Sequence, residues 1–412
     1  MLWLISLLKS LFLIYFKIIK GELRMKRIKL LLGFSVLVLV LCIASLGVMA
    51  ADKLPVVIGL QAPITGAAAI EGEMAKQSVE IAAQMINEKG GILDGRMIEI
   101  RVADDGCQPK AGALAAMKLI SQKDIVAAIQ TYGSSVTQPA SDIYEKFKKV
   151  NVAYGATVTG LTERGLKYFF RTCGRTDTQG QFFADEVVPL FNAKKVAIMH
   201  DNQTFSLGLA EDTEKALQPK IDAGEVELVY FDAITPGESD YTVPLTKLRE
   251  TNPDIFYFTG YFPEAGLIIR QARDIGITAV FVGGDAAINE DFINIAGLEY
   301  AAGCYQTQEA LIEYFTNPEA VAFKEAYMAK YNTLPSSPWS VYAADALCVL
   351  AEAIDKSGST DSDVIADYLR NKMDKFPSIT GPISFDEIGD RVGTGINLYV
   401  VNADGSFGIY GK

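Results

Sequence analysis

Residues 125–145 read IVAAIQTYGSSVTQPASDIYE and join a short apolar run to a helix-like segment through one glycine and two serines. The run from Ile125 to Ile129 predicts a buried strand, since strands of parallel sheets are almost continuously apolar. Ser134 and Ser135 then have two alternative roles. A serine can cap the helix by accepting a hydrogen bond from an amide of the first turn, or its hydroxyl and the free amides can hold a ligand carboxylate. The local sequence alone favours capping.

Strand-like and helix-like segments alternate on both sides of this stretch. Further strand-like segments are 54–65, 97–105 and 151–158 in a first series, and 194–202, 226–234, 254–261 and 279–286 in a second. Short apolar, β-branched runs separated by amphipathic helices predict parallel sheets covered on both faces. We therefore expect an α/β fold with two Rossmann-like lobes that meet near Thr176. The helix-like segments 320–332 and 340–357 and the hairpin-like end 395–411 can complete either lobe.

The first fifty residues differ from the rest of the chain. The basic start at Met25, the apolar stretch Leu30–Leu41 and the small residue Ala50 predict a cleaved secretory signal peptide over 25–50. Residues 1–24 are interpreted as a mis-called upstream start, with a second membrane helix as the alternative. Cys42 follows a leucine instead of a small residue, so we expect a released protein in the periplasm or outside the cell. An uncleaved signal would instead leave an anchored protein.

Charge and cysteine content exclude several classes of partner. Removing residues 1–50 takes away seven of the 38 basic and one of the 50 acidic residues, which leaves a net charge of −18. Such an acidic chain is not expected to bind nucleic acid, because phosphate binding relies on a basic surface. The four remaining cysteines, Cys107, Cys173, Cys304 and Cys348, lack metal-ligand spacing, so we expect neither a metal nor a cofactor.

Catalytic motifs are missing from the sequence. His200 is the only histidine, and we find no G-x-S-x-G, no P-loop and no G-x-G-x-x-G. We therefore expect that the protein is not an enzyme.

Polar and glycine-rich residues follow four of the predicted strands. They are Tyr132–Ser135, Gly155–Thr157, Tyr261 and Gly283–Asp285. Ligands of open α/β sheets bind at the carboxyl ends of the strands. Because both series contribute such ends, the sequence predicts a ligand cleft shared by two lobes, and this makes ligand binding by Ser134 more plausible than the local sequence suggested.

Five segments carry a resemblance to a known family. They are GSSVTQPASDIYE (133–145), LTERG (161–165), RTCGRTDTQG (171–180), TGYFPEAGLIIRQARDIG (259–276) and GPISFDEIGD (381–390). In this order they resemble the branched-chain amino-acid-binding proteins of ABC importers, the leucine/isoleucine/valine-binding group of the type I periplasmic binding proteins. The resemblance runs from about Pro55 to the end of the chain.

The resemblance implies two lobes joined by hinge strands, with a ligand clamped between them. The first lobe would comprise residues 54–175 and 308–387, and the second 176–307 and 388–412. The implied function is capture of an amino acid, with branched-chain or other apolar ones favoured, by a monomer that delivers it to a membrane permease. A sensor module, or a binder of a more polar amino acid or small carboxylate, is the alternative.

The resemblance also assigns roles to individual residues. Ser134 and Thr157 match the residues that bind the ligand carboxylate, and the Gly155 carbonyl and Asp285 match the groups that bind its ammonium. Tyr261 matches a tyrosine near that ammonium. A helix cap at Asp285 and a half-buried surface aromatic at Tyr261 are the structural alternatives.

Three positions depart from the family pattern. Glu71 stands where a tyrosine usually covers the ligand side chain, and Phe205 stands where another tyrosine is usual. Cys107 matches one half of a family disulfide whose other half falls at Gly133, so that crosslink should be missing. A buried carboxylate is costly unless paired. Glu71 therefore either turns to solvent or faces a polar or cationic ligand side chain. Tyr132, Trp339 and Phe205 instead favour an apolar or aromatic ligand.

Overall fold

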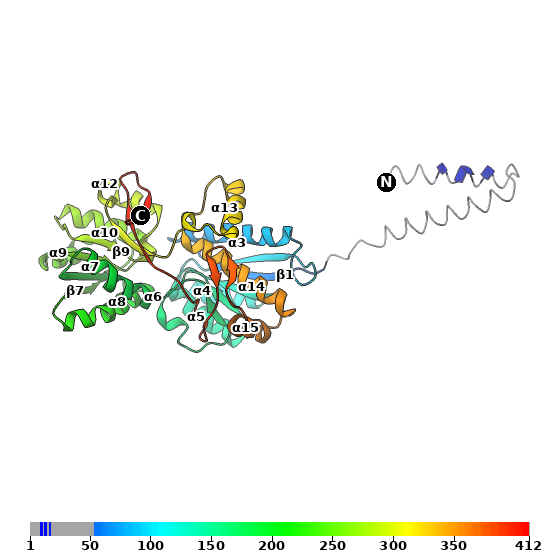
Figure 1. Cartoon of the computed structure of the whole chain (residues 1–412), viewed down its shortest axis with the longest axis horizontal. Helices are drawn as coiled ribbons and strands as arrows, with labels where there is room; N and C mark the ends of the chain where they lie inside the picture. The colour runs from blue at the N-terminus through cyan, green and yellow to red at the C-terminus, as the bar shows by residue number, and fades with distance from the viewer. Residues whose placement is uncertain (1–8, 11, 15, 18–52, 412) are drawn as a thin grey trace. The chain divides into compact units, whose positions relative to one another are not determined.

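The computed structural model describes residues 9–10, 12–14, 16–17 and 53–411 (Figure 1). The chain divides into two compact units, Met1–Lys53 and Leu54–Lys412, and the second unit contains the α/β architecture. The signal peptide predicted at 25–50 and most of residues 1–24 lie outside the described residues. No helix among the described residues combines the length and apolar character that crossing a membrane requires.

A five-stranded sheet, in which all neighbouring strands are parallel, forms the centre of the first lobe. In spatial order its strands are β2 (Ile98–Asp104), β1 (Val56–Ala62), β3 (Ile125–Gln130), β4 (Asn151–Ala153) and β5 (Phe169–Arg171). Strands β1 and β3 are buried along their whole length, as expected for central strands covered on both faces. The apolar run at Ile125–Ile129 is therefore a central strand.

Helices cover both faces of this sheet. They are α3 (Ala69–Glu88), α4 (Pro109–Ile120), α5 (Ser134–Lys146), α13 (Pro318–Tyr331), α14 (Pro338–Ser357) and α15 (Ser362–Asn371). Helices α3 and α14 pack against each other in the main core, where Val79 and Leu347 are fully buried. Helices α4 and α5 cover the opposite face, where Ala116 packs with Tyr144. A two-stranded sheet of β11 (Phe376–Ser378) and β12 (Gly381–Ile383) follows α15.

The second lobe is built on a seven-stranded mixed sheet. In spatial order its strands are β14 (Phe407–Ile409), β13 (Asn397–Val401), β10 (Tyr305–Gln308), β9 (Val280–Gly283), β8 (Ile255–Phe258), β6 (Lys195–His200) and β7 (Glu227–Ala233). The strands from β10 to β7 are parallel. Strands β13 and β14 form the predicted C-terminal hairpin, and β13 pairs antiparallel with β10.

Helices also cover both faces of the second sheet. They are α6 (Thr176–Phe182), a π-helical turn (Phe183–Val187), α7 (Val188–Leu190), α8 (Thr204–Asp222), α9 (Thr242–Glu250), α10 (Phe262–Asp274), α11 (Glu290–Ala296) and α12 (Leu298–Ala301). Successive residues of a strand point to opposite faces. Along β6, Val196 and Ile198 accordingly pack in the core that holds α8, whereas Ala197 and Met199 pack in the core that holds α9 and α10.

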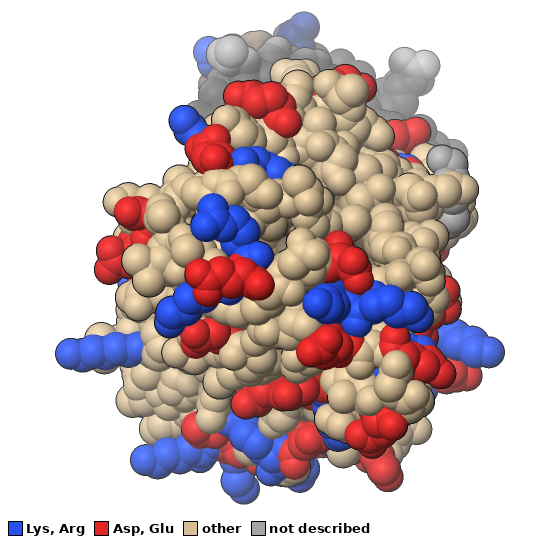
Figure 2. Space-filling view, turned by 90° about the vertical axis from the view of Figure 1, so that its left-hand side faces the viewer, with Lys and Arg blue, Asp and Glu red and all other residues tan. Residues whose placement is uncertain are grey.

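The chain passes between the two sheets after β5, after β10 and after β12. Figure 1 shows the elements of the two sheets in separate halves of the 53–411 part of the chain. We propose the lobe limits 54–175 with 308–387 and 176–307 with 388–412, because these limits fall at the three crossings. On the face of the second lobe shown in Figure 2, acidic and basic side chains are interspersed and form no continuous basic stripe.

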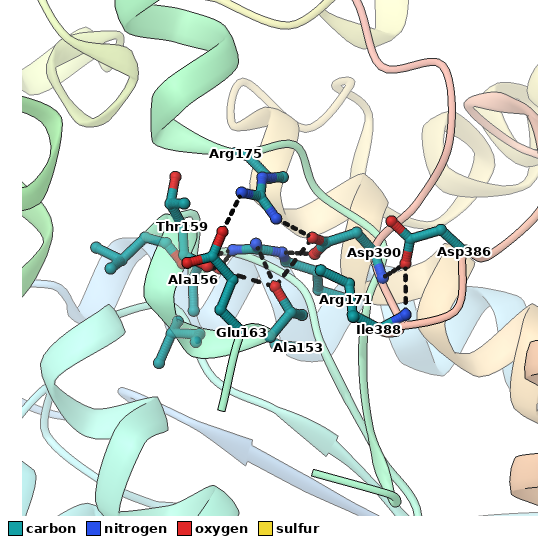
Figure 3. A network of polar contacts seen from close by, with 12 residues as sticks. Ala153, Ala156, Thr159, Glu163, Arg171, Arg175, Asp386, Ile388 and Asp390 are labelled. Atoms are coloured by element: carbon teal, nitrogen blue, oxygen red, sulfur yellow. Dashed lines mark hydrogen bonds and ion pairs between the residues drawn. The ribbon is translucent and has the colours of Figure 1, made fainter. Parts of the chain in front are cut away.

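A buried arginine fastens the first crossing to the third. Arg171 ends β5 with no exposed surface, and its guanidinium donates to the carboxylate of Asp390 (Figure 3). The same guanidinium donates to the carbonyl oxygens of Ala156 at 3.1 Å and Val158 at 2.9 Å. These two carbonyls flank Thr157, so the arginine that pairs with Asp390 also holds the loop that carries a predicted ligand residue.

Asp390 receives further donors. Arg175 approaches one of its oxygens at 2.6 Å, and the Thr162 hydroxyl donates to that oxygen at 2.9 Å. Burial raises the pKa of Asp390, but the charge of Arg171 and the hydrogen bonds from Arg171, Arg175 and Thr162 outweigh burial and hold the pKa below its usual 3.8. The neighbouring Gly389 has φ +92°, and a Cβ there would lie 2.5 Å from the Phe169 carbonyl oxygen, so this turn requires glycine.

The four cysteines within the described residues are free thiols. A Cβ placed on Gly133 would lie 3.0 Å from the Cys107 sulfur. About 3 Å is the distance that a bonded S–S pair of roughly 2.05 Å imposes between one sulfur and the opposite Cβ. Gly133 has φ −89° and ψ 134°, which any residue can adopt. The distance from Cys107 to residue 133 therefore suits a crosslink, but glycine supplies no second sulfur.

Replacing Asp390 with asparagine should lower the free energy of unfolding by about 3 kcal/mol at neutral pH, because it leaves the buried Arg171 charge uncompensated. Since the pKa of Asp390 is depressed in the folded state, the difference between wild type and variant should be constant above about pH 4 and shrink as the pH falls further. Urea unfolding at several pH values measures this difference.

The matched control is Asp142→Asn, which removes the acid of an exposed ion pair with Arg164, where the Asp142 side chain is 63% exposed. We expect it to cost less than about 1 kcal/mol. Equal losses for the two variants would show that burial of the Arg171–Asp390 pair has no special weight.

Replacing Gly133 with cysteine should create a disulfide with Cys107 under oxidising conditions and stabilise the protein by about 3 kcal/mol, because the crosslink restricts the unfolded chain. Thiol titration should find two fewer free thiols than in the reduced variant, and the gain in melting temperature should vanish on reduction. Gly133→Ser controls for the added side chain. Two thiols that stay titratable after oxidation would contradict the geometry.

Candidate functional site

Ser134 does not cap helix α5. Gly133 occupies the N-cap position, and no side chain caps this helix, so the capping interpretation is wrong for both Ser134 and Ser135. Ser134 is 1% exposed, and its hydroxyl lies 3.5 Å from the amide of Val158. It therefore faces the loop that carries Thr157. Ser135 is partly exposed in the same first turn.

Thr157 of the first lobe and Asp285 of the second lobe lie close together. Both residues are 3% exposed, and the Thr157 hydroxyl and one Asp285 carboxylate oxygen lack a hydrogen-bonding partner of standard geometry. Burial and the nearby charge of Glu309 raise the pKa of Asp285 well above its usual value, and the Thr157 hydroxyl is close enough to oppose that rise. A threonine of the first lobe and an acid of the second thus face one another with unused hydrogen-bonding capacity.

Glu309 adds a second buried acid beside Asp285. It follows β10 at the second crossing, is 3% exposed, and has no hydrogen-bonding partner of standard geometry at either carboxylate oxygen. Burial raises its pKa to about 7, although the charge of Arg391 opposes the shift. No local sequence pattern marks Glu309 as a site residue.

Gly155 lies where a side chain has no room. A Cβ at this position would lie 2.9 Å from the Tyr132 carbonyl oxygen. The close approach lets the backbone of residues 155–157 pass directly against the end of strand β3. The predicted residues Ser134, Gly155 and Thr157 therefore lie together at the carboxyl ends of neighbouring strands.

Four of the predicted aromatic residues form a chain of ring contacts between the lobes. The Tyr132 ring lies 6.2 Å from that of Trp339 within the first lobe and 5.9 Å from that of Tyr261 in the second. Tyr261 continues the chain to Phe205 at 5.2 Å. Phe205, Tyr132 and Trp339 are buried, whereas Tyr261 is half-buried. These rings give the site an apolar wall.

Glu71 does not turn to solvent, and that alternative is wrong. Its side chain is 1% exposed, and its carboxylate accepts hydrogen bonds from Asn289 Nδ2 at 2.6 Å and from the Ser337 hydroxyl. Asn289 belongs to the second lobe, and Ser337 precedes α14 in the first. The carboxylate that sequence analysis left without a partner is therefore bonded by the protein itself, across the two lobes.

A cavity of about 430 Å³ lies at this junction. Its lining includes Ala68, Cys107 and Tyr132 of the first lobe and Gln203 and Tyr261 of the second. Of the predicted residues only Tyr132 and Tyr261 line it, so the cavity lies beside Ser134, Thr157 and Asp285 and does not contain them. The volume is in the range of small-molecule sites, which are usually 300–1,000 Å³. A cavity of about 450 Å³ on the first lobe, lined by α3, α14 and β11, contains none of the predicted residues.

Sequence reasoning missed the partners of Glu71 and the hinge acids. From the sequence, Asn289 can be recognised only as a helix cap. The structure shows this cap, in which the Asn289 side chain accepts a hydrogen bond from the amide of Asp291, two residues later. Its contact with Glu71 spans 218 residues, and no local pattern encodes such a contact.

Comparison with known proteins places these features in one family. The family model described as periplasmic binding protein matches residues 55–406. The Leu/Ile/Val-binding protein BraC3 of Rhizobium johnstonii is 34% identical over 358 residues, which cover 87% of this chain and 94% of the relative. The leucine-specific-binding protein of Salmonella typhimurium is 34% identical over 365 residues, which cover 88% and 94%.

Two solved structures share the fold. A leucine binding protein from Thermotoga maritima superposes with a TM-score of 0.79 at 29% identity, and a branched-chain amino acid substrate binding protein from Streptococcus pneumoniae in complex with isoleucine with a TM-score of 0.78 at 29% identity. Each match covers 86% of this chain and 97% of the other. The predicted two-lobed α/β fold is confirmed, and the chain belongs to the periplasmic binding protein family, whose members bind solutes and catalyse no reaction.

Proposed function

We propose that this protein captures a branched-chain or other apolar amino acid outside the cytoplasmic membrane and delivers it to the permease of an ABC importer. The observation that carries the proposal is that Thr157 and Asp285, one from each lobe, face each other with buried oxygens that have unused hydrogen-bonding capacity. Buried polar atoms are nearly always hydrogen-bonded, so two buried oxygens with unused hydrogen-bonding capacity between the lobes indicate a ligand site.

The chemistry of these groups fits a zwitterion. The hydroxyls of Ser134 and Thr157 and the free amides at the start of α5 are donors for a carboxylate, and the positive end of the helix dipole adds to them. Asp285 and the Gly155 carbonyl are acceptors for an ammonium. Charge-assisted hydrogen bonds of this kind are about twice as strong as neutral ones. Closing the lobes on the ligand would exclude water and strengthen both sets.

The aromatic wall indicates which class of ligand side chain the site prefers. Because the Glu71 carboxylate already accepts hydrogen bonds from Asn289 and Ser337, it does not need a polar ligand group, and the apolar rings of Tyr132, Phe205 and Trp339 decide the preference. The names of the relatives, which bind leucine, isoleucine or valine, support the same class.

Export is part of the proposal. The family is periplasmic, and the signal peptide predicted at 25–50 would bring the chain there. The related protein from Streptococcus pneumoniae is a substrate-binding protein of a branched-chain amino acid transporter, which supports an ABC permease as the partner to which this protein delivers its ligand.

A thermal-shift screen of the twenty amino acids and of small carboxylates tests the ligand class. A ligand at a hundred times its dissociation constant should stabilise the folded protein by about 2.7 kcal/mol. We expect leucine, isoleucine or valine to give the largest shift. A screen in which only small carboxylates shift the melting temperature would refute an amino-acid ligand.

Replacing Asp285 with asparagine should weaken leucine binding by at least tenfold, because a hydrogen bond to a charged group is worth about 1.5–3 kcal/mol. Binding of 4-methylpentanoate, which is leucine without its amino group, should change far less. Thr157→Val is the matched control, since it should weaken both ligands alike at their shared carboxylate. Isothermal titration calorimetry gives the dissociation constant of each variant relative to wild type for each of the two ligands. Equal losses of affinity for both ligands with Asp285→Asn would contradict the assigned role.

A further inference from the structure

Glu71 joins three elements through one carboxyl group. It lies in the first turn of α3 and receives hydrogen bonds from Asn289, which caps α11 in the second lobe, and from Ser337, which precedes α14 in the first lobe. The bond from Asn289 to Glu71 connects the two lobes directly, as does the bond from the Thr159 hydroxyl to Asp212 at 2.9 Å. Ala68, three residues before Glu71, lines the 430 Å³ cavity.

The orientation of Asn289 makes this contact directional. Its Oδ1 accepts a hydrogen bond from the Asp291 amide at 2.8 Å as the cap of α11, so its Nδ2 must point the other way, toward Glu71. An amide held in this orientation can only donate to residue 71. The contact therefore requires an acceptor there, which both a carboxylate and a carboxylic acid provide. The Ser337 hydroxyl can donate to the carboxylate or accept from the acid.

The surroundings of Glu71 favour its neutral form when the lobes are closed. Burial raises its pKa from 4.5 to about 7, the hydrogen bonds from Ser337 and Asn289 oppose the rise, and the charge of Asp291 on α11 adds to it. The other titratable groups that interact with Glu71 are Cys107, Tyr132 and Tyr154, whose pKa values burial and the Glu71 charge both raise. No ion pair of Glu71 with a basic side chain occurs among the described residues.

We propose that Glu71 and Asn289 form a latch that holds the two lobes closed over the ligand, and that closing this latch takes up a proton. The proposal rests on the function proposed above and adds to it a regulation of the same site. In an open cleft the carboxyl group meets water and ionises freely. When the lobes close, it enters a buried site without a cation, and a proton removes the cost of burying its charge.

The sign of the pH effect follows from linkage. A group whose pKa is higher in the closed state than in the open state favours closure at low pH, and this contribution is lost as the pH rises through the closed-state value. With 4.5 for the open and about 7 for the closed state, the contribution of Glu71 to ligand affinity should fall by about tenfold or more between pH 5.5 and pH 8.

Isothermal titration calorimetry with leucine at pH 5.5 and pH 8 tests the latch on the intact mature protein. In Glu71→Gln the amide oxygen can accept from Asn289 and the amide nitrogen can donate to Ser337, so the latch closes without a proton. We expect the ratio of the dissociation constant at pH 8 to that at pH 5.5 to be about tenfold smaller than in wild type, because residue 71 no longer takes up a proton. Any contribution of Asp285 to the pH dependence is common to both proteins and cancels in the comparison. An unchanged ratio would overturn the proposal.

Asn289→Asp is the opposing variant. Aspartate caps a helix as well as asparagine does, but it places a second carboxylate against Glu71. We expect weaker leucine binding at pH 8 than in wild type, and a larger ratio of the dissociation constant at pH 8 to that at pH 5.5. A smaller ratio would contradict the latch.

The failure of the latch and of the proposed function can be told apart. If wild type binds no amino acid at either pH, the proposed function is wrong. If wild type binds leucine but Glu71→Gln keeps the wild-type ratio, the amino-acid site stands and the proton latch is wrong.

Discussion

The Arg171–Asp390 ion pair is the interaction on which the geometry of the cleft depends. It joins the end of β5 to the third crossing, and the remaining donors of the same guanidinium hold the carbonyls on either side of Thr157. A fully buried arginine is stable only because every partner is present, including Arg175 and Thr162 around the shared acid. The hinge and the ligand loop therefore share one buried network, and a change at the hinge reaches the loop directly.

This network explains why two of the segments that carried the family resemblance lie far apart in the sequence. Residues 171–180 contain both arginines, and 381–390 contain the acid and the turn that presents it. Asp386 accepts hydrogen bonds from the Ile388 and Asp390 amides at 3.0 and 2.8 Å and so fixes that turn (Figure 3). The two segments are two sides of one contact, which a comparison of motifs records without showing that they touch.

Local patterns were enough for the sheets and for part of the site. The apolar runs predicted β3 and β6, and the polar strand ends placed Ser134, Gly155 and Thr157 at one edge, because carboxyl ends of parallel strands meet there. They failed for Glu71, whose partners Asn289 and Ser337 are 218 and 266 residues away. A buried carboxylate is decided by tertiary partners, so its environment could not follow from the loop that contains it. Glu309 was missed because a lone acid after a strand has no pattern of its own.

The acids of this protein fall into two electrostatic groups. Asp390 is paired with two arginines, and its pKa is held low, so its charge is compensated within the protein. Glu71, Asp285 and Glu309 are buried in the described structure without an ion pair, and burial raises the pKa of each. If the cleft closes as proposed, burial costs free energy at these three acids; the proposed ligand ammonium would offset that cost at Asp285, and the proposed proton would offset it at Glu71. The hinge acid thus has its counter-charges in the protein, whereas we expect the closed cleft to need compensation of its acids from outside the protein.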